Sequence, residues 1–169
     1  LFSFTANNLA DRDLRFVMPS SEVESNDERI ISLARQITSG LASDYKKAVA
    51  IHDWIASNLK YDYENMKDSN KTNYSALDVL ESGIAVCDGY CDLMAALCRA
   101  VGIPARIISG DEHAWNEVFA DGRWFPVDVT WDGDGYRLNG EPVGLRHTYF
   151  DPPVEEFRKD HPAGKAENK

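Results

Sequence analysis

The sequence has few positive charges, few cysteines and no long hydrophobic run, and each shortage excludes a class of protein. The chain of 169 residues carries 18 basic residues against 28 acidic ones, a net charge of −10. An acidic chain is a poor partner for the phosphates of nucleic acid or for an anionic membrane surface. No apolar run reaches the roughly 20 residues that a transmembrane helix needs. We therefore expect neither nucleic-acid binding nor a membrane span in this chain.

The cysteines Cys87, Cys91 and Cys98 all lie in one short stretch with helical spacing. At about 100° per residue, Cys91 and Cys98 fall within roughly 40° of Cys87 around the helix axis. Side chains on neighbouring turns of one helix rarely meet disulfide geometry, so neither a disulfide framework nor a zinc site built from these three alone is expected. Cys91 and Cys98 are expected to pack as small buried hydrophobic residues. The sequence gives no reason to expect a cofactor or a metal.

The apolar share of 43% is enough for one hydrophobic core, and the length suits one domain. We expect an N-terminal arm over 1–27, a catalytic domain over 28–162 and a polar, frayed tail over 163–169. Because the chain starts without Met and shows no signal peptide, we expect a processed protein or an excised fragment. Its location stays open, and the cell envelope or the outside of the cell is one alternative.

Helical patterns come first along the chain. Ser, Asp or Asn residues suited to capping precede predicted helices over about 28–39, 44–59 and 75–80, and a longer helix is predicted over about 86–101. The polar residues 60–74 are predicted to form a long loop, and loops of this length are often functional.

Strand patterns follow the helices. Strands are predicted over 104–109, 114–120 and 123–129, with one more within 136–150. The dipeptide Asp121-Gly122 between two strand patterns is a hairpin signal. Helices followed by antiparallel strands indicate an α+β domain.

A candidate nucleophile, base and orienting acid stand on these elements. Cys87 lies at the start of the long helix, where unpaired N–H groups and the helix dipole favour a thiolate. His113 precedes a strand and can exchange a proton with a thiol and a leaving amine. A hairpin turning at Asp121-Gly122 pairs positions whose numbers sum to about 243. That register places Asp128 within one or two residues of His113, where a carboxylate can fix the tautomer of the imidazole.

The blocks around these residues resemble the transglutaminase-like core. The resemblance is carried by residues 86–91, 97–106, 113–116 and 127–131. It covers about residues 48–160. The family it resembles has a papain-like α+β fold, with Cys at a helix N-terminus packed on an antiparallel sheet that carries His and Asp. Its members include peptidases, cross-linking transglutaminases, deamidases and proteins that have lost the triad. By this resemblance Cys87, His113 and Asp128 are the catalytic residues.

The resemblance implies a thioester mechanism that acts on peptide, isopeptide or glutamine amide bonds. Hydrolysis is slightly favoured over transamidation, and a protein or peptide, including cell-wall peptide, is the expected partner. A non-catalytic module that binds peptide or cell-wall material on the same fold is the alternative. Intact Cys, His and Asp positions argue against that alternative.

Aromatic residues near the triad are candidates for substrate contact. The four candidates are Trp115, Trp131, Tyr90 and Tyr61. Trp115 and Trp131 either line an acyl-binding groove or pack as core aromatics, and the residues do not decide between the two. The second donor to an oxyanion stays open between Tyr61, Asn73 and Tyr74. Of the other histidines, His52 is expected to serve the surface or the core, and His147 and His161 carry no independent signal.

Overall fold

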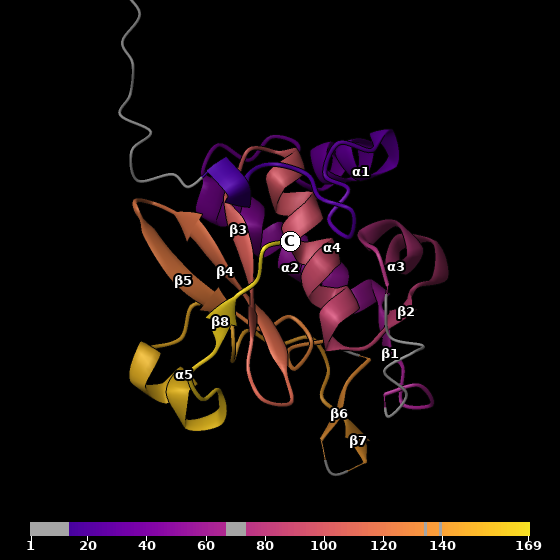
Figure 1. Ribbon diagram of the computed structural model, residues 1–169, viewed down its shortest axis with the longest axis vertical. Helices are drawn as coiled ribbons and strands as arrows, with labels where there is room; N and C mark the ends of the chain where they lie inside the picture. Colours follow the sequence, from indigo (N-terminus) through magenta and orange to yellow (C-terminus); the bar gives the residue numbers. More distant parts are fainter. Residues whose placement is uncertain (1–13, 67–73, 134, 139) are drawn as a thin grey trace, which may run out of the picture.

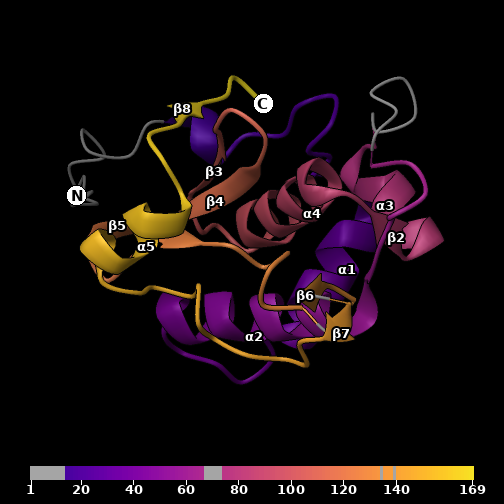
Figure 2. The same cartoon turned by 90° about the horizontal axis from the view of Figure 1, so that it is seen from below.

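The computed structural model describes residues 14–66, 74–133, 135–138 and 140–169. Its centre is a four-stranded antiparallel sheet with the strand order β5-β4-β3-β8 (Figure 1). The strands are β3 (Ala105–Ser109), β4 (Ala114–Ala120), β5 (Arg123–Val127) and β8 (Lys165–Ala166). Helices cover one face of this sheet and α5 lies against the other (Figure 2). The predicted α+β class is confirmed.

Four helices form the layer on the first face of the sheet. They are α1 (Glu28–Ile37), α2 (Asp44–Asn58), α3 (Ala76–Ser82) and α4 (Cys87–Ala100). The side chains of Asp27, Ser43 and Ser75 accept N–H groups of the first turns of α1, α2 and α3, which explains where these helices begin. α4 is buried along most of its length because it lies between the sheet and the other three helices.

Strand β4 divides its side chains between two cores. Ala114, Val118 and Ala120 face α4 and belong to the main hydrophobic core. Trp115 points to the opposite face, where it packs with Ile108 and with Phe157 of α5 (Val154–Asp160). This alternation follows from the two-residue period of a strand.

The C-terminal residues differ from the frayed tail that the sequence predicts. β8 pairs with β3, and Ile108 lies opposite Ala166 in this pair. Without β8, strand β3 would be an edge strand with unpaired backbone groups. The Arg99 guanidinium, on buried α4, donates to the carbonyl of Lys169 at 2.8 Å. The residues are polar, but tertiary hydrogen bonds hold them in place.

Two further segments differ from the expected elements. Within 136–150 the structure has a hairpin of two short strands, β6 (Arg137–Leu138) and β7 (Glu141–Pro142), in place of the one strand predicted. Gly140 lies in that turn at φ 87°, a conformation that suits glycine. In the predicted N-terminal arm, residues 14–16 form a short 3-10 helix.

A small parallel pair of strands brings the loop after α2 beside the start of α4. β1 (Lys60–Tyr61) pairs with β2 (Ile84–Ala85), and Tyr61 lies opposite Ala85, two residues before Cys87. Gly89 allows this close packing, because a Cβ there would lie 2.6 Å from the Ala85 Cβ. Among the described residues, no helix combines the length and the apolar character needed to cross a bilayer.

Candidate active site

Cys87 is the first residue of α4. Val86 takes the N-cap position and offers no side-chain hydrogen bond, so the first N–H groups of α4 have no capping side chain. The Cys87 side chain is half-buried, whereas Cys91 and Cys98 are buried. Burial raises the pKa of Cys91 well above its usual range and that of Cys98 to about 12. Of the three thiols, Cys87 is therefore the one placed to react, and the other two pack as the sequence predicts.

The β4–β5 hairpin brings His113 and Asp128 together. In this hairpin Asn116 pairs with Val127 and Glu117 with Pro126, so paired residue numbers sum to 243, as the turn predicts. Asp128 follows the last residue of β5 and His113 precedes the first residue of β4. The His113 Nε2 lies 2.7 Å from Asp128 Oδ2. The predicted contact between the imidazole and the carboxylate is present.

Asp128 is a buried carboxylate whose two oxygens each receive two N–H groups. Oδ1 accepts the backbone N–H groups of Thr130 at 3.0 Å and Trp131 at 3.1 Å. Oδ2 accepts from His113 and, at 2.9 Å, from Nε2 of His161. Burial alone would raise the pKa of Asp128, but the hydrogen bonds from His113 and His161 outweigh it and hold the pKa at about 2. Asp128 is therefore a fixed negative charge beneath His113.

His113 lies between this charge and the thiol. Burial lowers its pKa, yet the Asp128 hydrogen bond and the nearby Cys87 side chain outweigh burial and raise the pKa to about 10. Since Nε2 is held by Asp128, Nδ1 is the nitrogen left to exchange a proton with sulfur. Cys87 and His113 line the same hollow of about 200 Å³. Trp131 stacks on the His113 ring, with centroids 4.6 Å apart and planes 14° apart, and so restricts the ring's rotation.

His161 is a member of this site that the sequence did not reveal. Its ring is buried, stacks on Phe157 at a centroid distance of 3.8 Å and packs against Trp131 at 4.6 Å. The residue follows α5 and reaches Asp128 from 33 positions further along the chain. The sequence patterns that pointed to the site lie around Cys87, His113 and Asp128, and no local pattern at His161 could have done so.

A larger cleft of about 610 Å³ adjoins the hollow at Cys87, because both are lined by Gly110, Asp111, Glu112 and His113. Trp131, Trp115 and Tyr61 line this cleft, a position from which they could contact a substrate. Trp115 also packs in the core between the sheet and α5, with an exposed fraction of 5%, so its core role is observed and its contact with substrate stays a prediction. Tyr90 is fully buried behind Tyr61 and does not line the cleft. Contact between Tyr90 and a substrate stays a prediction, and the buried position of Tyr90 does not favour it.

The candidates for the second oxyanion donor separate by position. Tyr61 lines the cleft, and its own pKa is raised by burial and by the nearby Cys87 side chain. The Tyr74 hydroxyl donates to Asp62 at 2.7 Å and is thereby engaged elsewhere. Asn73 lies outside the described residues. Tyr61 is the candidate that the geometry favours.

Comparison with known proteins assigns the family. The family model of the transglutaminase-like superfamily matches residues 31–129. The chain belongs to this superfamily, as its resemblance to the transglutaminase-like core predicted. The match contains Cys87, His113 and Asp128 and ends before His161.

Two curated relatives align with about half of this chain. Kyphoscoliosis peptidase of Mus musculus is 30% identical over 105 residues, which covers 53% of this chain and 16% of that protein. The uncharacterized protein YebA of Bacillus subtilis is 32% identical over 89 residues, which covers 52% of this chain and 12% of that protein. The chain therefore spans only a small part of the length of these relatives.

Solved structures share the fold. A proposed cysteine protease from Cytophaga hutchinsonii is 27% identical with a TM-score of 0.64, and the alignment covers 96% of this chain and 54% of that one. A proposed protease from Parabacteroides distasonis has a TM-score of 0.51 at 18% identity, over 70% of this chain and 25% of that one. The second likeness concerns the fold alone.

Proposed function

We propose that this protein is a thiol-dependent acyl-transfer enzyme that cleaves peptide, isopeptide or glutamine amide bonds through Cys87, His113 and Asp128. The observation that carries the proposal is the linear order of these groups. A half-buried thiol at a helix N-terminus adjoins an imidazole whose far nitrogen is held by a fully buried carboxylate. This order matches the roles of nucleophile, base and orienting acid.

In the first half of the proposed reaction, Cys87 sulfur attacks the carbonyl carbon of the amide and His113 holds the thiol proton on Nδ1. The negative oxygen of the tetrahedral intermediate lies by the uncapped N–H groups at the start of α4. The C–N bond then breaks, and His113 delivers its proton to the leaving amine. The product is a thioester on Cys87 and a free amine. Asp128 keeps its charge throughout and stabilises the imidazolium.

In the second half, a nucleophile enters the cleft and resolves the thioester. His113 takes the proton of the incoming water, the C–S bond breaks, and the thiol of Cys87 is restored with release of a carboxylic acid. An amine in place of water gives transamidation by the same steps. We favour hydrolysis because relatives that match this chain carry peptidase or protease names.

The charge of the cleft supports a substrate with a positive group. Its lining includes the exposed carboxylates of Asp111, Glu112 and Asp160, and none of the described residues that line it is Lys or Arg. Five Tyr and Trp rings complete the walls: those of Tyr61, Tyr63, Trp115, Trp131 and Tyr136. A basic peptide side chain or a primary amine suits such a surface through charge attraction and cation–π contacts.

The proposal is tested by following two products of one reaction mixture. Purified protein is incubated with a peptide library and a fluorescent primary amine, and mass spectrometry records cleaved peptides and amine-labelled glutamine. We expect cleavage to exceed labelling and to prefer peptides with Lys or Arg. The Cys87→Ala variant should lose both, whereas the matched variant Cys98→Ala, at a buried thiol, should keep them.

Two outcomes would contradict the proposal. Turnover that survives in Cys87→Ala would place the chemistry elsewhere, and saturable peptide binding with no turnover in the wild type would favour the non-catalytic module. The charge argument has its own test. Asp111→Asn with Glu112→Gln should lower kcat/KM for basic peptides by about two- to tenfold, because each exposed charge pair contributes little. Neutral peptides should be unaffected.

A further inference from the structure

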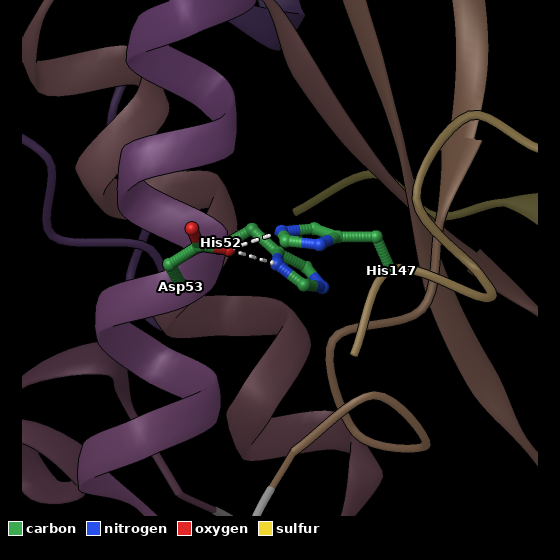
Figure 3. A group of neighbouring side chains, drawn as sticks. All are labelled: His52, Asp53 and His147. Carbon is green, nitrogen blue, oxygen red and sulfur yellow. Dashed lines mark hydrogen bonds and ion pairs between the residues drawn. The ribbon is translucent and has the colours of Figure 1, made fainter. Parts of the chain in front are cut away.

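A second cluster of chemically active side chains lies outside the cleft. His52 and Asp53 are neighbours on α2, and His147 comes from the segment that follows β7. Figure 3 shows both imidazole rings directed at the Asp53 carboxylate. His52 Nδ1 lies 2.9 Å and His147 Nε2 2.6 Å from the same oxygen, Oδ1. None of the three residues lines the cleft at the catalytic centre.

The other nitrogen of His52 meets a second carboxylate. His52 is fully buried, and its Nε2 lies 3.3 Å from Oδ2 of Asp132, which is also fully buried. A neutral imidazole has one N–H group, so it can donate to only one of the two carboxylates. If that proton serves the buried Asp132, the lone pair of Nδ1 faces Asp53. A cation at this point would resolve the conflict between the lone pair and the carboxylate.

We propose that His52 Nδ1, Asp53 Oδ1 and His147 Nε2 form a binding site for a divalent transition-metal ion, with Zn²⁺ the best match. These three atoms lie within 4.8 Å of one another. Two imidazole nitrogens and one carboxylate oxygen are the protein ligands of open zinc sites, which keep a fourth position for water. Calcium and magnesium prefer sites made of oxygen atoms alone.

The surroundings fit this assignment. Metal-bound histidines almost always pass their other N–H to a carboxylate, and the Asp132 carboxylate lies 3.3 Å from that nitrogen of His52, although the two atoms do not meet hydrogen-bond geometry. Asp132 is itself held, because its Oδ2 accepts the backbone N–H of Tyr149 at 2.9 Å. The Asp53 and His147 side chains are 35% and 49% exposed, which gives an ion a path from solvent.

The ligand atoms need a small adjustment. Bonds of about 2.0–2.1 Å in a tetrahedral site place ligand atoms roughly 3.3 Å apart, so the two short contacts must open by about half an ångström. The partly exposed side chains of Asp53 and His147 can provide this by rotation, while His52 stays fixed in the core.

Such an ion would join α2 to the segment that supports the catalytic carboxylate. Two residues after His147, the carbonyl of Tyr149 accepts the backbone N–H of Asp128 at 3.0 Å. The metal would therefore brace the chain beside Asp128 without touching the substrate. Its expected effect is on stability, with no part in the bond changes.

Calorimetric titration with ZnCl₂ tests the proposal. The protein is the full chain with Cys87→Ala, since a thiol next to an imidazole could bind zinc by itself. We expect one ion per chain and a higher melting temperature that EDTA reverses. Adding His147→Ala should weaken zinc binding at least about tenfold. Loss of a residue that only hydrogen-bonds to a metal ligand already has an effect of that size, and His147 is a proposed ligand itself. Asp53→Asn should act in the same direction.

A matched variant separates this cluster from the catalytic one. His113, Asp128 and His161 also offer three ligand atoms close together, so His113→Ala is added to Cys87→Ala as the control. We expect zinc binding to survive this change. Binding that His113→Ala abolishes, binding that both His147→Ala and Asp53→Asn leave intact, or no saturable binding up to about 1 mM zinc would each overturn the proposal. Circular dichroism checks that every variant is folded.

Discussion

Replacing Asp128 with asparagine is expected to trap His113 in a tautomer that cannot accept the proton of Cys87. The wild-type carboxylate accepts four N–H groups, two from the backbone of Thr130 and Trp131 and two from His113 and His161. An asparagine offers one oxygen and one NH₂ group. Backbone N–H groups cannot become acceptors, so the oxygen must face Thr130 and Trp131. The NH₂ group then faces the two histidines.

This orientation determines the size of the effect. To accept from the NH₂ group, His113 must carry its proton on Nδ1, the nitrogen that faces Cys87. We expect turnover to fall by about 10³–10⁴, as it does in serine triads when the same replacement imposes the wrong tautomer. Loss of a single neutral hydrogen bond would have a much smaller effect, about 1 kcal/mol or roughly fivefold.

Stability should fall as well, through His161. Its Nδ1 is buried and has no hydrogen-bonding partner among the described residues, so a proton moved there would be an unsatisfied donor. Such a donor costs about 1–3 kcal/mol. Urea unfolding followed by circular dichroism measures this loss, and the variant should still fold because its size and shape are those of aspartate.

Asp128→Ala provides the comparison that isolates the tautomer. Alanine removes the charge but leaves His113 free to choose either tautomer, so Asp128→Ala should retain more activity than Asp128→Asn. Turnover of the best peptide from the library gives both values. Equal activity in the two variants would refute the tautomer argument, and full activity in Asp128→Asn would make Asp128 a structural residue.

Three further outcomes are expected. Brief, low-dose iodoacetamide treatment near neutral pH should modify Cys87 and spare Cys91 and Cys98, because burial raises the pKa values of those two thiols. Equal labelling of the three cysteines in the folded protein would remove the basis of the mechanism. Because the pKa of Asp128 falls from 3.8 to about 2 on folding, its contribution to stability should be complete well above pH 4 and be lost as the pH falls through 2. Urea midpoints of wild type and Asp128→Asn should therefore converge in that window, and parallel curves would contradict the shift. His161→Phe keeps the stack on Phe157 but removes a donor to Asp128, so activity should drop about tenfold or more. The loss of stability in acid should also move to higher pH. His161→Gln should partly restore both the activity and the acid stability.

Parts of the fold governed by local rules could be predicted from the sequence. Asp121-Gly122 sets the turn of the β4–β5 hairpin, and the turn sets a register in which Asn116 meets Val127. That register alone places Asp128 beside His113. The start of α4 at Cys87 follows in the same way from helical periodicity after the break at Gly83, which has φ 68°.

Contacts between residues far apart in the sequence could not be predicted, because no periodic pattern encodes them. His161 reaches Asp128 across 33 positions, and His147 reaches Asp53 across 94. Each histidine belongs to a polar stretch with weak periodicity, where the sequence around it is compatible with an exposed position. The pairing of β8 with β3 has the same origin, since two residues are too few to form a strand pattern.

The Asp128 carboxylate, which we propose to be catalytic, depends on more of the chain than the family match contains. That match ends at residue 129, yet Asp128 receives a hydrogen bond from His161 and passes its own N–H to Tyr149, both beyond the match. A buried charge is stable only when its hydrogen-bonding capacity is filled. Residues 31–129 alone would therefore hold the three proposed triad positions in sequence while leaving the carboxylate with one of its four donors, His113, and open to water. The segment from Tyr149 to His161, with α5 packed on Trp115, is what makes Asp128 a fixed negative charge beneath His113.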